Sequence, residues 1–219
     1  YCYLQGYFSS PDLVLFLNHD EIIRDMTSKI EGETWFHAGE FSDSLALSHL
    51  TGELALYHEF CSQNTLANVE LRTKSSNIKE LLKLSPLPNL ITSFSLSPME
   101  VIKEFDHKTA PLKSRLKAIA ELVKQGHQIG IHLDPVIFHP DYKVQYQELL
   151  ESLRNVLPDS HLAYLSLGVI RFPKDIHREV ERNYPNSALL AQEFVQSQGL
   201  VRYDKPLRMN LLKTIQKIV

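Results

Sequence analysis

Short apolar and β-branched runs alternate along the chain with segments of helical spacing. Six runs have the length and composition of a β-strand, and they cover residues 13–18, 34–39, 69–74, 90–97, 128–136 and 164–172. Strands that alternate with helices pair in parallel, because a crossover is needed to return the chain to the same end of a sheet. The pattern therefore predicts an α/β fold with a parallel sheet.

Three apolar stripes at helical spacing lie between these runs. The clearest covers residues 111–126, where Pro111 at the start and Gly126 past the end are typical of helix ends. Its stripe consists of Leu112, Leu116, Ile119 and Val123, a second of Leu47, Leu50, Leu54, Tyr57 and Cys61, and a short third of Ile78, Leu81 and Leu82. Helices on one face favour a barrel or an open part of one, and a flavodoxin-like open sheet is the alternative.

Polar side chains follow the predicted strands where each strand ends. The set comprises Glu40 with Ser42 and Asp43, Lys74 with Ser75, Ser95 with Ser97, then Asp134 and Arg171. In a parallel barrel these ends converge at one mouth, where binding sites lie. Each residue alone is also compatible with a helix cap or a solvated loop. Together they predict a polar site at the carboxyl ends of the strands.

Composition limits the class of protein without choosing a substrate. A chain of 219 residues with 43% apolar content can bury one large core, so we expect a single domain over residues 1–219. The net charge of -3 provides no general attraction for nucleic acid or anionic membranes. Two cysteines make no disulfide framework, and no secretory segment or long apolar span is visible. A soluble cytoplasmic protein is expected.

The chain opens Tyr1-Cys2-Tyr3-Leu4-Gln5 without an initiator Met, so we expect it to begin inside a cysteine motif. A Cys-x3-Cys-x2-Cys loop holds three irons of a 4Fe-4S cluster and leaves the fourth open. The opening YCYLQ resembles the last arm of this loop in the spore photoproduct lyase family, and the resemblance implies that Cys2 is the third thiolate. Cys61 lies on an apolar helical stripe and is assigned to core packing.

The pair Gly39-Glu40 after the second predicted strand resembles the Gly-Gly-Glu motif by which radical S-adenosylmethionine enzymes hold the methionyl amine. In such a motif a glycine lets the ligand's ammonium approach the backbone while the carboxylate pairs with it. Lys74 could bind a carboxylate as a compact cation. Taken alone, both remain compatible with surface positions.

Several blocks of the sequence resemble, in order, the spore photoproduct lyase family of the radical S-adenosylmethionine superfamily. These blocks are residues 1–5, 36–43 with 49–51, 72–74, 94–96, 110–112 with Arg115, and 181–185. The resemblance implies a partial (β/α)6 TIM-like barrel whose first strand and other cluster cysteines precede Tyr1. It also implies two cofactors, S-adenosylmethionine and a 4Fe-4S cluster. Reductive cleavage of S-adenosylmethionine at the cluster would give a 5'-deoxyadenosyl radical, which acts on an unknown substrate, with DNA a candidate.

The same resemblance implies roles for individual residues. Cys2 matches the third cluster cysteine, and Tyr1 and Tyr3 match tyrosines that pass hydrogen atoms. The positions of the cofactor site are Glu40, Ser42, Lys74 and Ser95. Flavodoxin or ferredoxin is the implied electron donor, for a monomeric enzyme that needs no membrane.

Two regions depart from the family pattern. Glu40 stands where the lyase has the cysteine that donates hydrogen to the substrate radical, and a carboxylate cannot do so because its O-H bond is much stronger than S-H. The segment 186–219 is the variable C-terminal part, and its stretch 198–208 carries Arg202, Tyr203, Lys205 and Arg208. Such basic residues around an aromatic are consistent with nucleic-acid contact.

Two other functions compete with the radical enzyme. One is a non-catalytic binding module on a degenerate barrel. The other is a metal-dependent hydrolase in which His132, Asp134 and His139 hold zinc near one strand end.

Overall fold

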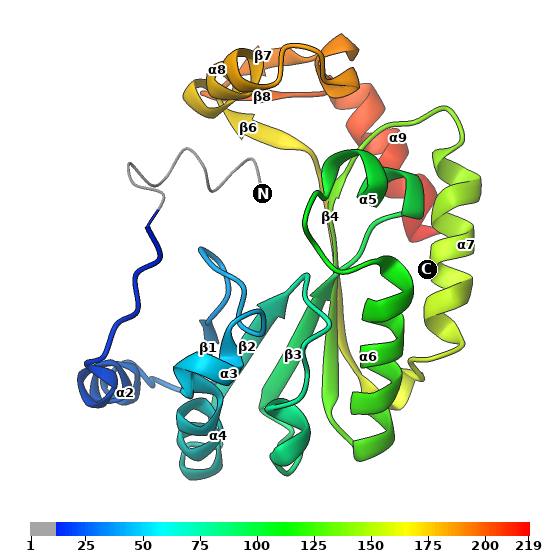
Figure 1. Cartoon of the computed structure of the whole chain (residues 1–219). Coiled ribbons are helices and arrows are strands. Elements are labelled where there is room, and N and C mark those ends of the chain that lie inside the picture. The colour runs from blue at the N-terminus through cyan, green and yellow to red at the C-terminus, as the bar shows by residue number, and fades with distance from the viewer. Residues whose placement is uncertain (1–11) are drawn as a thin grey trace.

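A curled sheet of five parallel strands forms the body of the protein, which a computed structural model describes over residues 12–219. The strands are β1 (Thr34–His37), β2 (Ala67–Thr73), β3 (Leu90–Ser95), β4 (Gln128–Val136) and β5 (Leu162–Val169). They lie in the order β1-β2-β3-β4-β5 (Figure 1), each parallel to its neighbour. The sheet is a half-barrel, which confirms the predicted partial TIM-like fold.

Helices lie around this half-barrel. They are α2 (His19–Ser28), α3 (Ser48–Thr51), α4 (Glu53–Gln63), α5 (Met99–Phe105), α6 (Leu112–Gln125) and α7 (Tyr142–Arg154), with short 3-10 turns at Leu81–Lys83 and Asp159–His161. Among them α4 and α6 contact its strands. Because each strand pairs with the next one along the chain, right-handed crossovers place the connections on the same side of the sheet. A flavodoxin-like sheet would need a reversal of strand order, so that alternative is wrong.

Alternating side chains on β2 separate the core from the hollow interior. Val69 and Leu71 are fully buried and belong to the main hydrophobic core. Glu70 and Arg72 have the opposite parity, and side chains of a strand alternate between its two faces. These two therefore lie on the concave face of the half-barrel, where a polar cluster forms.

The predicted strand at residues 13–18 is wrong, since residues 12–18 form no strand in the structure and are exposed. Leu13 is 85% and Leu17 is 79% exposed, so apolar composition there produces no pairing with a neighbour. The stripe from Leu47 to Cys61 is also not one helix, because Gly52 takes a left-handed conformation with φ 69° and separates α3 from α4.

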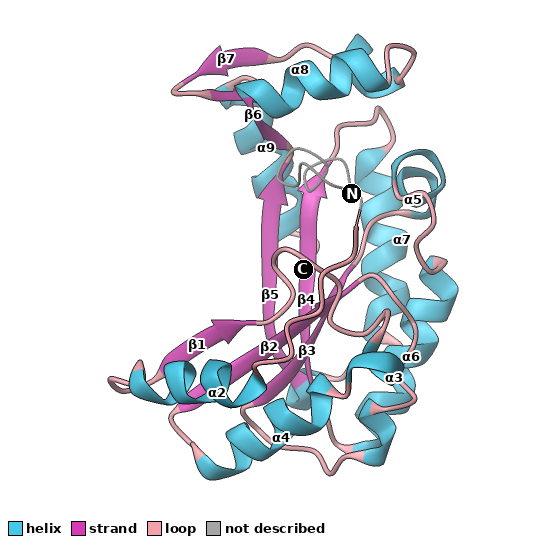
Figure 2. Cartoon of the chain, turned by 60° about the vertical axis from the view of Figure 1, so that its left-hand side comes forward, coloured by secondary structure: helices cyan, strands magenta, loops and turns pink. Residues whose placement is uncertain are grey.

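The run predicted as one strand over residues 164–172 is divided between two sheets. After β5 the Ile170 amide donates to the Val136 carbonyl, and the chain then enters β6 (Arg171–Pro173). The remaining elements are α8 (Lys174–Asn183), a 3-10 turn (Ala188–Ala191), β7 (Val195–Ser197), β8 (Leu200–Arg202) and α9 (Lys205–Gln216). Strands β6, β8 and β7 form an antiparallel sheet beyond the carboxyl ends of β4 and β5 (Figure 2), here called the C-terminal sheet.

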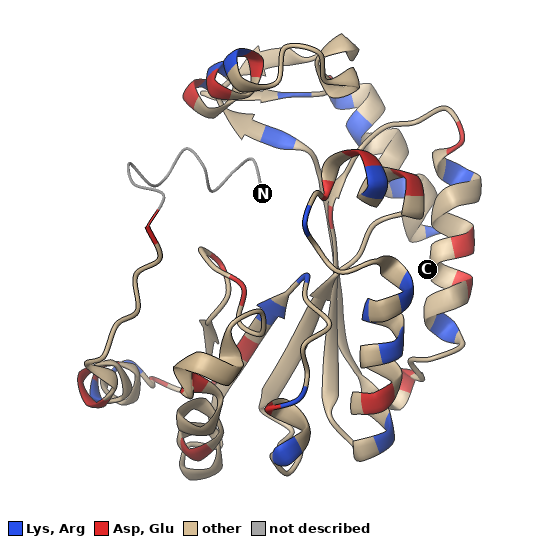
Figure 3. Ribbon diagram, in the orientation of Figure 1, with Lys and Arg blue, Asp and Glu red and all other residues tan. Residues whose placement is uncertain are grey.

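Charged residues of both signs are interspersed along α6, α7 and α8 (Figure 3), in keeping with the small net charge. Over residues 12–219, no helix is both long and apolar enough to cross a bilayer.

Candidate active site

A cavity of about 840 Å³ lies at the carboxyl ends of the parallel strands, between the half-barrel and the C-terminal sheet. Residues at or just beyond the ends of all five strands contribute to its wall. These are Gly39, Glu40 and Ser42 after β1, Arg72 and Lys74 from β2, Ser95 and Ser97 from β3, Asp134 and Ile137 from β4, and Ile170 and Arg171 after β5. Apolar residues of the C-terminal sheet and α8, including Phe172, Val180 and Leu200, line the opposite side.

All four residues predicted to surround a cofactor line this cavity. Glu40 and Ser42 are exposed on the loop after β1, whereas Lys74 and Ser95 are buried. Within residues 12–219 the Glu40 carboxylate has no hydrogen-bond or ion-pair partner. It is therefore free to meet a cationic group of a ligand.

Gly39 fixes the approach of the Glu40 loop to the neighbouring strand. A Cβ atom at this position would lie 2.6 Å from the Arg72 carbonyl oxygen and 2.7 Å from Ser44 Oγ. Those distances are too short for any side chain, so only glycine lets the loop pack against β2 here. The Ser44 hydroxyl and amide then secure the loop, donating to the carbonyls of Ala38 and Arg72 at 3.0 Å.

Asp43, a predicted site residue, instead organises the backbone. Its Oδ1 accepts from the amides of Leu45 and Ala46 and from Thr73 Oγ1, and its Oδ2 accepts from the Lys74 amide at 2.8 Å. Four donors satisfy this carboxylate, so it joins the loop after β1 to the end of β2.

A buried cation network holds Lys74 at the cavity wall. Lys74 Nζ lies 2.5 Å from Asp106 Oδ1, and Arg115 Nη2 lies 3.5 Å from Asp106 Oδ2. The Arg115 side chain is fully buried, and it donates to the carbonyl oxygens of Ser95 and Ala110 and to Thr109 Oγ1. The residues of this Arg115 network thus connect α6 with the ends of β2 and β3.

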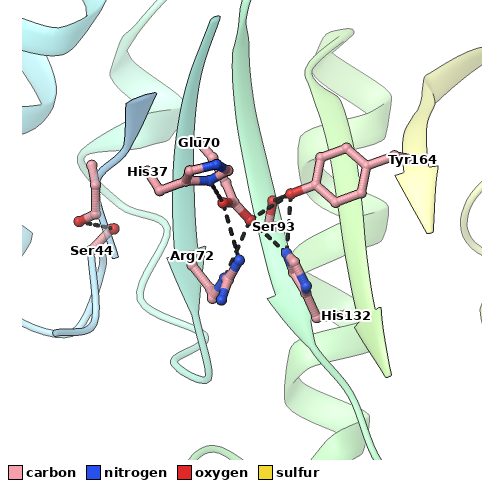
Figure 4. A network of polar contacts seen from close by, with 8 residues as sticks. His37, Ser44, Glu70, Arg72, Ser93, His132 and Tyr164 are labelled. Atoms are coloured by element: carbon pink, nitrogen blue, oxygen red, sulfur yellow. Dashed lines mark hydrogen bonds and ion pairs between the residues drawn. The ribbon is translucent and has the colours of Figure 1, made fainter. Parts of the chain in front are cut away.

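A second polar cluster, the Glu70 cluster, occupies the concave face of the half-barrel (Figure 4). The Glu70 carboxylate is fully buried and contacts side chains from four strands. At Glu70 Oε1, His132 Nε2 lies 2.5 Å away and the Tyr164 hydroxyl donates a hydrogen bond. At Oε2, Arg72 Nη2 donates at 3.2 Å and His37 Nδ1 is also in contact. Ser93 Oγ completes the cluster 2.6 Å from the Tyr164 oxygen.

The strand register explains how Tyr164 reaches the centre of this cluster. Tyr164, Gly130, Ser93 and Arg72 are neighbours in one row across β5, β4, β3 and β2. A Cβ at Gly130 would lie 2.5 Å from Ser93 Oγ and 2.7 Å from Tyr164 Cζ. The missing side chain of Gly130 therefore leaves the space through which the phenol crosses to Ser93 and Glu70.

The cluster keeps Glu70 ionised. Burial alone would raise the pKa of Glu70, but hydrogen bonds with His132, Tyr164 and His37 and the charge of Arg72 outweigh it, and the pKa falls well below its ordinary value of 4.5. Burial and the hydrogen bond to Glu70 raise the pKa of Tyr164, so the phenol retains its proton. Arg72, which also lines the cavity, is thereby fixed beside a permanent negative charge.

Reasoning from strand ends did not find Glu70, because this residue lies in the middle of β2. A signal was present: in β2 the polar Asn68, Glu70 and Arg72 alternate with apolar residues, so they share the face opposite the core. Buried carboxylates are almost always paired, so partners on neighbouring strands were to be expected.

The zinc-hydrolase alternative is wrong, because its three residues have different partners. His132 contacts Glu70, Asp134 lies 3.4 Å from Arg171, and His139 Nδ1 accepts from the Asp141 amide. Across the described part of the chain, no three His, Cys, Asp or Glu side chains are grouped to hold a metal ion.

Tyr203 is unavailable for stacking on a nucleic-acid base, contrary to one reading of residues 198–208. Its side chain is fully buried, packs on Phe194 with a ring separation of 4.9 Å, and contacts Gln192. Burial raises the pKa of Tyr203 to about 12.

Cys61 is buried in the core as predicted, and burial likewise raises the pKa of its thiol to about 12.

The predicted cluster ligand Cys2 and the predicted relay residues Tyr1 and Tyr3 lie outside the described residues. Their roles stay predictions.

A parallel half-barrel with a polar cavity at the carboxyl ends of its strands defines a protein of the TIM-barrel-like class with a ligand site at the usual place. The family model for spore photoproduct lyase matches residues 1–207, and the chain belongs to that family.

Known relatives and solved structures agree with this assignment. The spore photoproduct lyase of Bacillus subtilis (strain 168) is 31% identical over 201 residues, which cover 88% of this chain and 58% of the relative. The enzyme of the same name from Geobacillus sp. (strain Y412MC61) is 28% identical and is covered to 58%, against 86% of this chain. The chain thus spans somewhat more than half the length of these relatives.

Among solved structures, a spore photoproduct lyase double mutant with bound AdoMet and dinucleoside spore photoproduct superposes with a TM-score of 0.88 at 25% identity. The match covers 100% of this chain and 68% of that one.

Proposed function

We propose that this chain forms the cofactor-binding barrel of a radical S-adenosylmethionine enzyme of the spore photoproduct lyase type. The observation that carries the proposal is that one cavity at the strand ends gathers Glu40, Ser42, Lys74 and Ser95. A similar solved structure, a spore photoproduct lyase, has AdoMet bound. The cavity itself follows from this chain's own side chains, and the ligand is that of a similar solved structure.

The lining of the cavity suits each part of S-adenosylmethionine. Glu40, which has no partner among residues 12–219, pairs with the ammonium group, and Lys74 binds the carboxylate. The hydroxyls of Ser42 and Ser95 provide neutral hydrogen-bond groups, and Ile137 and Ile170 provide apolar surface. When bound, S-adenosylmethionine and a 4Fe-4S cluster supply the 5'-deoxyadenosyl radical chemistry.

The protein's own part is to bind and orient the cofactor and to exclude water. Asp106 holds the Lys74 ammonium in place before any ligand enters, which lowers the entropic cost of binding. Cys2 is the proposed iron ligand, and Tyr1 or Tyr3 the proposed route for returning a hydrogen atom, since Glu40 has no S-H bond to offer. A nucleic-acid substrate and a flavodoxin or ferredoxin electron donor belong to the same proposal.

Replacing Glu40 by Gln is expected to weaken S-adenosylmethionine binding about tenfold, because a neutral amide forms a weaker bond with an ammonium group than a carboxylate does. The measurement is isothermal titration calorimetry on the full-length protein, reconstituted anaerobically with iron and sulfide. Glu121→Gln, on the exposed side of α6, is the matched control and should bind like the wild type.

The same preparation separates the competing functions. With reductant, the wild type should convert S-adenosylmethionine to 5'-deoxyadenosine and methionine. A full-length protein that binds the cofactor without cleaving it would be the non-catalytic module, and one that does not bind it at all would refute the proposal.

A further inference from the structure

A second cavity of about 480 Å³ lies beside the first and shares Lys74 and Lys108 with it. Its wall is formed by the loop after β2 and the loop that precedes α6. Besides the two shared lysines it includes Lys79, Ser75, Ser76, Asn77, Thr109 and Asp43. Cations and hydroxyl groups thus dominate its polar lining.

Two of the lysines have no acidic partner. Lys74 is paired with Asp106, but over the range 12–219 neither Lys79 nor Lys108 forms an ion pair or a side-chain hydrogen bond, and both are exposed. The one carboxylate in the wall, Asp43, already accepts four hydrogen bonds from the protein. The cavity therefore has uncompensated positive charge at its edge.

The loop that carries Lys108 is rigidly held. Arg115, fully buried, donates to Thr109 Oγ1 at 2.6 Å and to the Ala110 carbonyl at 2.8 Å. The Ala110 amide in turn donates to the Lys74 carbonyl at 3.2 Å. These bonds keep residues 109–110 against the end of β2.

Lys108 itself has φ 62°, in the left-handed region that glycine occupies most easily. A non-glycine residue there is strained, and such strain persists where the surrounding structure imposes it, commonly at binding sites. A lysine at this position directs a cation to the edge shared by both cavities, at a conformational cost that glycine would avoid.

We propose that the second cavity binds a phosphate group through Lys79, Lys108 and the Ser76 hydroxyl. Ammonium groups bind phosphate as point charges, and hydroxyl donors complete the set. The phosphate has two candidate sources: a free phosphate ion, or the backbone of a nucleic-acid substrate whose reacting nucleotide lies in the first cavity. The second source rests on the proposed function, whereas the phosphate site itself does not.

The first arm of the test measures inorganic phosphate binding to the full-length protein by calorimetry. The Lys79→Gln/Lys108→Gln double variant should raise the phosphate dissociation constant at least about tenfold, from the loss of two charge-assisted contacts. Lys124→Gln/Lys143→Gln, which removes two exposed lysines of α6 and α7, should leave it unchanged. Equal phosphate binding by wild type and the first double variant overturns the proposal, as does the absence of phosphate binding by the wild type.

Lys108→Gly guards against a folding artefact. Glycine relieves the strained φ, so this variant should unfold at the wild-type temperature or above it while binding phosphate more weakly. A Lys108→Gly protein of undiminished phosphate affinity would contradict the assignment of this lysine.

A second arm identifies the source. With an oligodeoxynucleotide, loss of two phosphate contacts should reduce the slope of log affinity against log salt concentration by about 2. A reduced slope supports a nucleic-acid backbone in the cavity; an unchanged slope with impaired phosphate binding supports a free phosphate ion. Binding of S-adenosylmethionine is measured in parallel and reports on the first cavity alone. Failure of the proposed function, seen as loss of S-adenosylmethionine binding, is thereby distinguished from failure of the phosphate site.

Discussion

Arg115→Met is expected to lower the free energy of unfolding by about 3–5 kcal/mol, because it breaks a buried ion pair and leaves its partners unsatisfied. The guanidinium is fully buried and donates to the Ser95 carbonyl at 2.7 Å, besides its bonds within residues 109–110. Methionine fills much of the same volume, so lost hydrogen bonds rather than an empty cavity account for the effect. Equilibrium unfolding in urea at neutral pH measures it.

The matched control is Arg178→Met, since Arg178 is an exposed helical arginine whose carboxylate partner, Asp175, is exposed too. Its expected effect is within about 0.5 kcal/mol of wild type. An Arg115→Met protein as stable as this control would show that the Arg115 network does not support the fold. The loop before α6 should become the first region of the variant to exchange its amide hydrogens.

Glu70→Gln is expected to destabilise the protein by about 3 kcal/mol at pH 7, because four side chains that surround a buried carboxylate lose their charged partner. Arg72 would retain a partly exposed charge, with a side chain that is 33% accessible, so water offsets some of its loss. The neutral amide also turns one NH₂ group toward the donors of the cluster. Urea unfolding again gives the magnitude, with Glu121→Gln as the exposed control.

The difference between wild type and Glu70→Gln should depend on pH in a defined direction. The pKa of Glu70 is lowered by folding from its ordinary value of 4.5. Above pH 4.5 the carboxylate is ionised in both the folded and unfolded states, and its stabilisation is fully present. As the pH falls below 4.5, the unfolded chain takes up a proton that the folded chain does not, and the stabilisation is progressively lost. A stability gap that stays constant down to pH 3 would contradict this assignment.

Elements whose limits are set by local signals were predictable from the sequence. Strand β4 (Gln128–Val136) coincides with its prediction, and α6 lies between Pro111 and Gly126, whose φ of 99° ends the helix. Residues 13–18 failed for the opposite reason, because a strand needs a neighbour to pair with, and apolar composition does not supply one. Likewise, the division of residues 164–172 between β5 and β6 depends on the Ile170–Val136 hydrogen bond, which is a tertiary contact.

The candidate site was predictable only where topology alone determines convergence. Strand ends meet in any parallel half-barrel, which is why Glu40, Ser42, Lys74 and Ser95 were found in one cavity. The Asp106 contact of Lys74 and the four-strand environment of Glu70 depend on register and on the missing side chain at Gly130. Neither the Asp106 contact nor the environment of Glu70 can be derived from the residue types without the structure.

The close packing at Gly130 restricts how homologous sequences can diverge. Any β-carbon there would force the Tyr164 ring away from Ser93 and from the Glu70 carboxylate, to which the phenol donates a hydrogen bond. Relatives that carry alanine or a larger residue at the position of Gly130 should therefore also have replaced Tyr164 and Glu70, so that these three positions change as a set. An alignment of the family in which they vary independently would show that the row across the sheet tolerates more rearrangement than its spacing suggests.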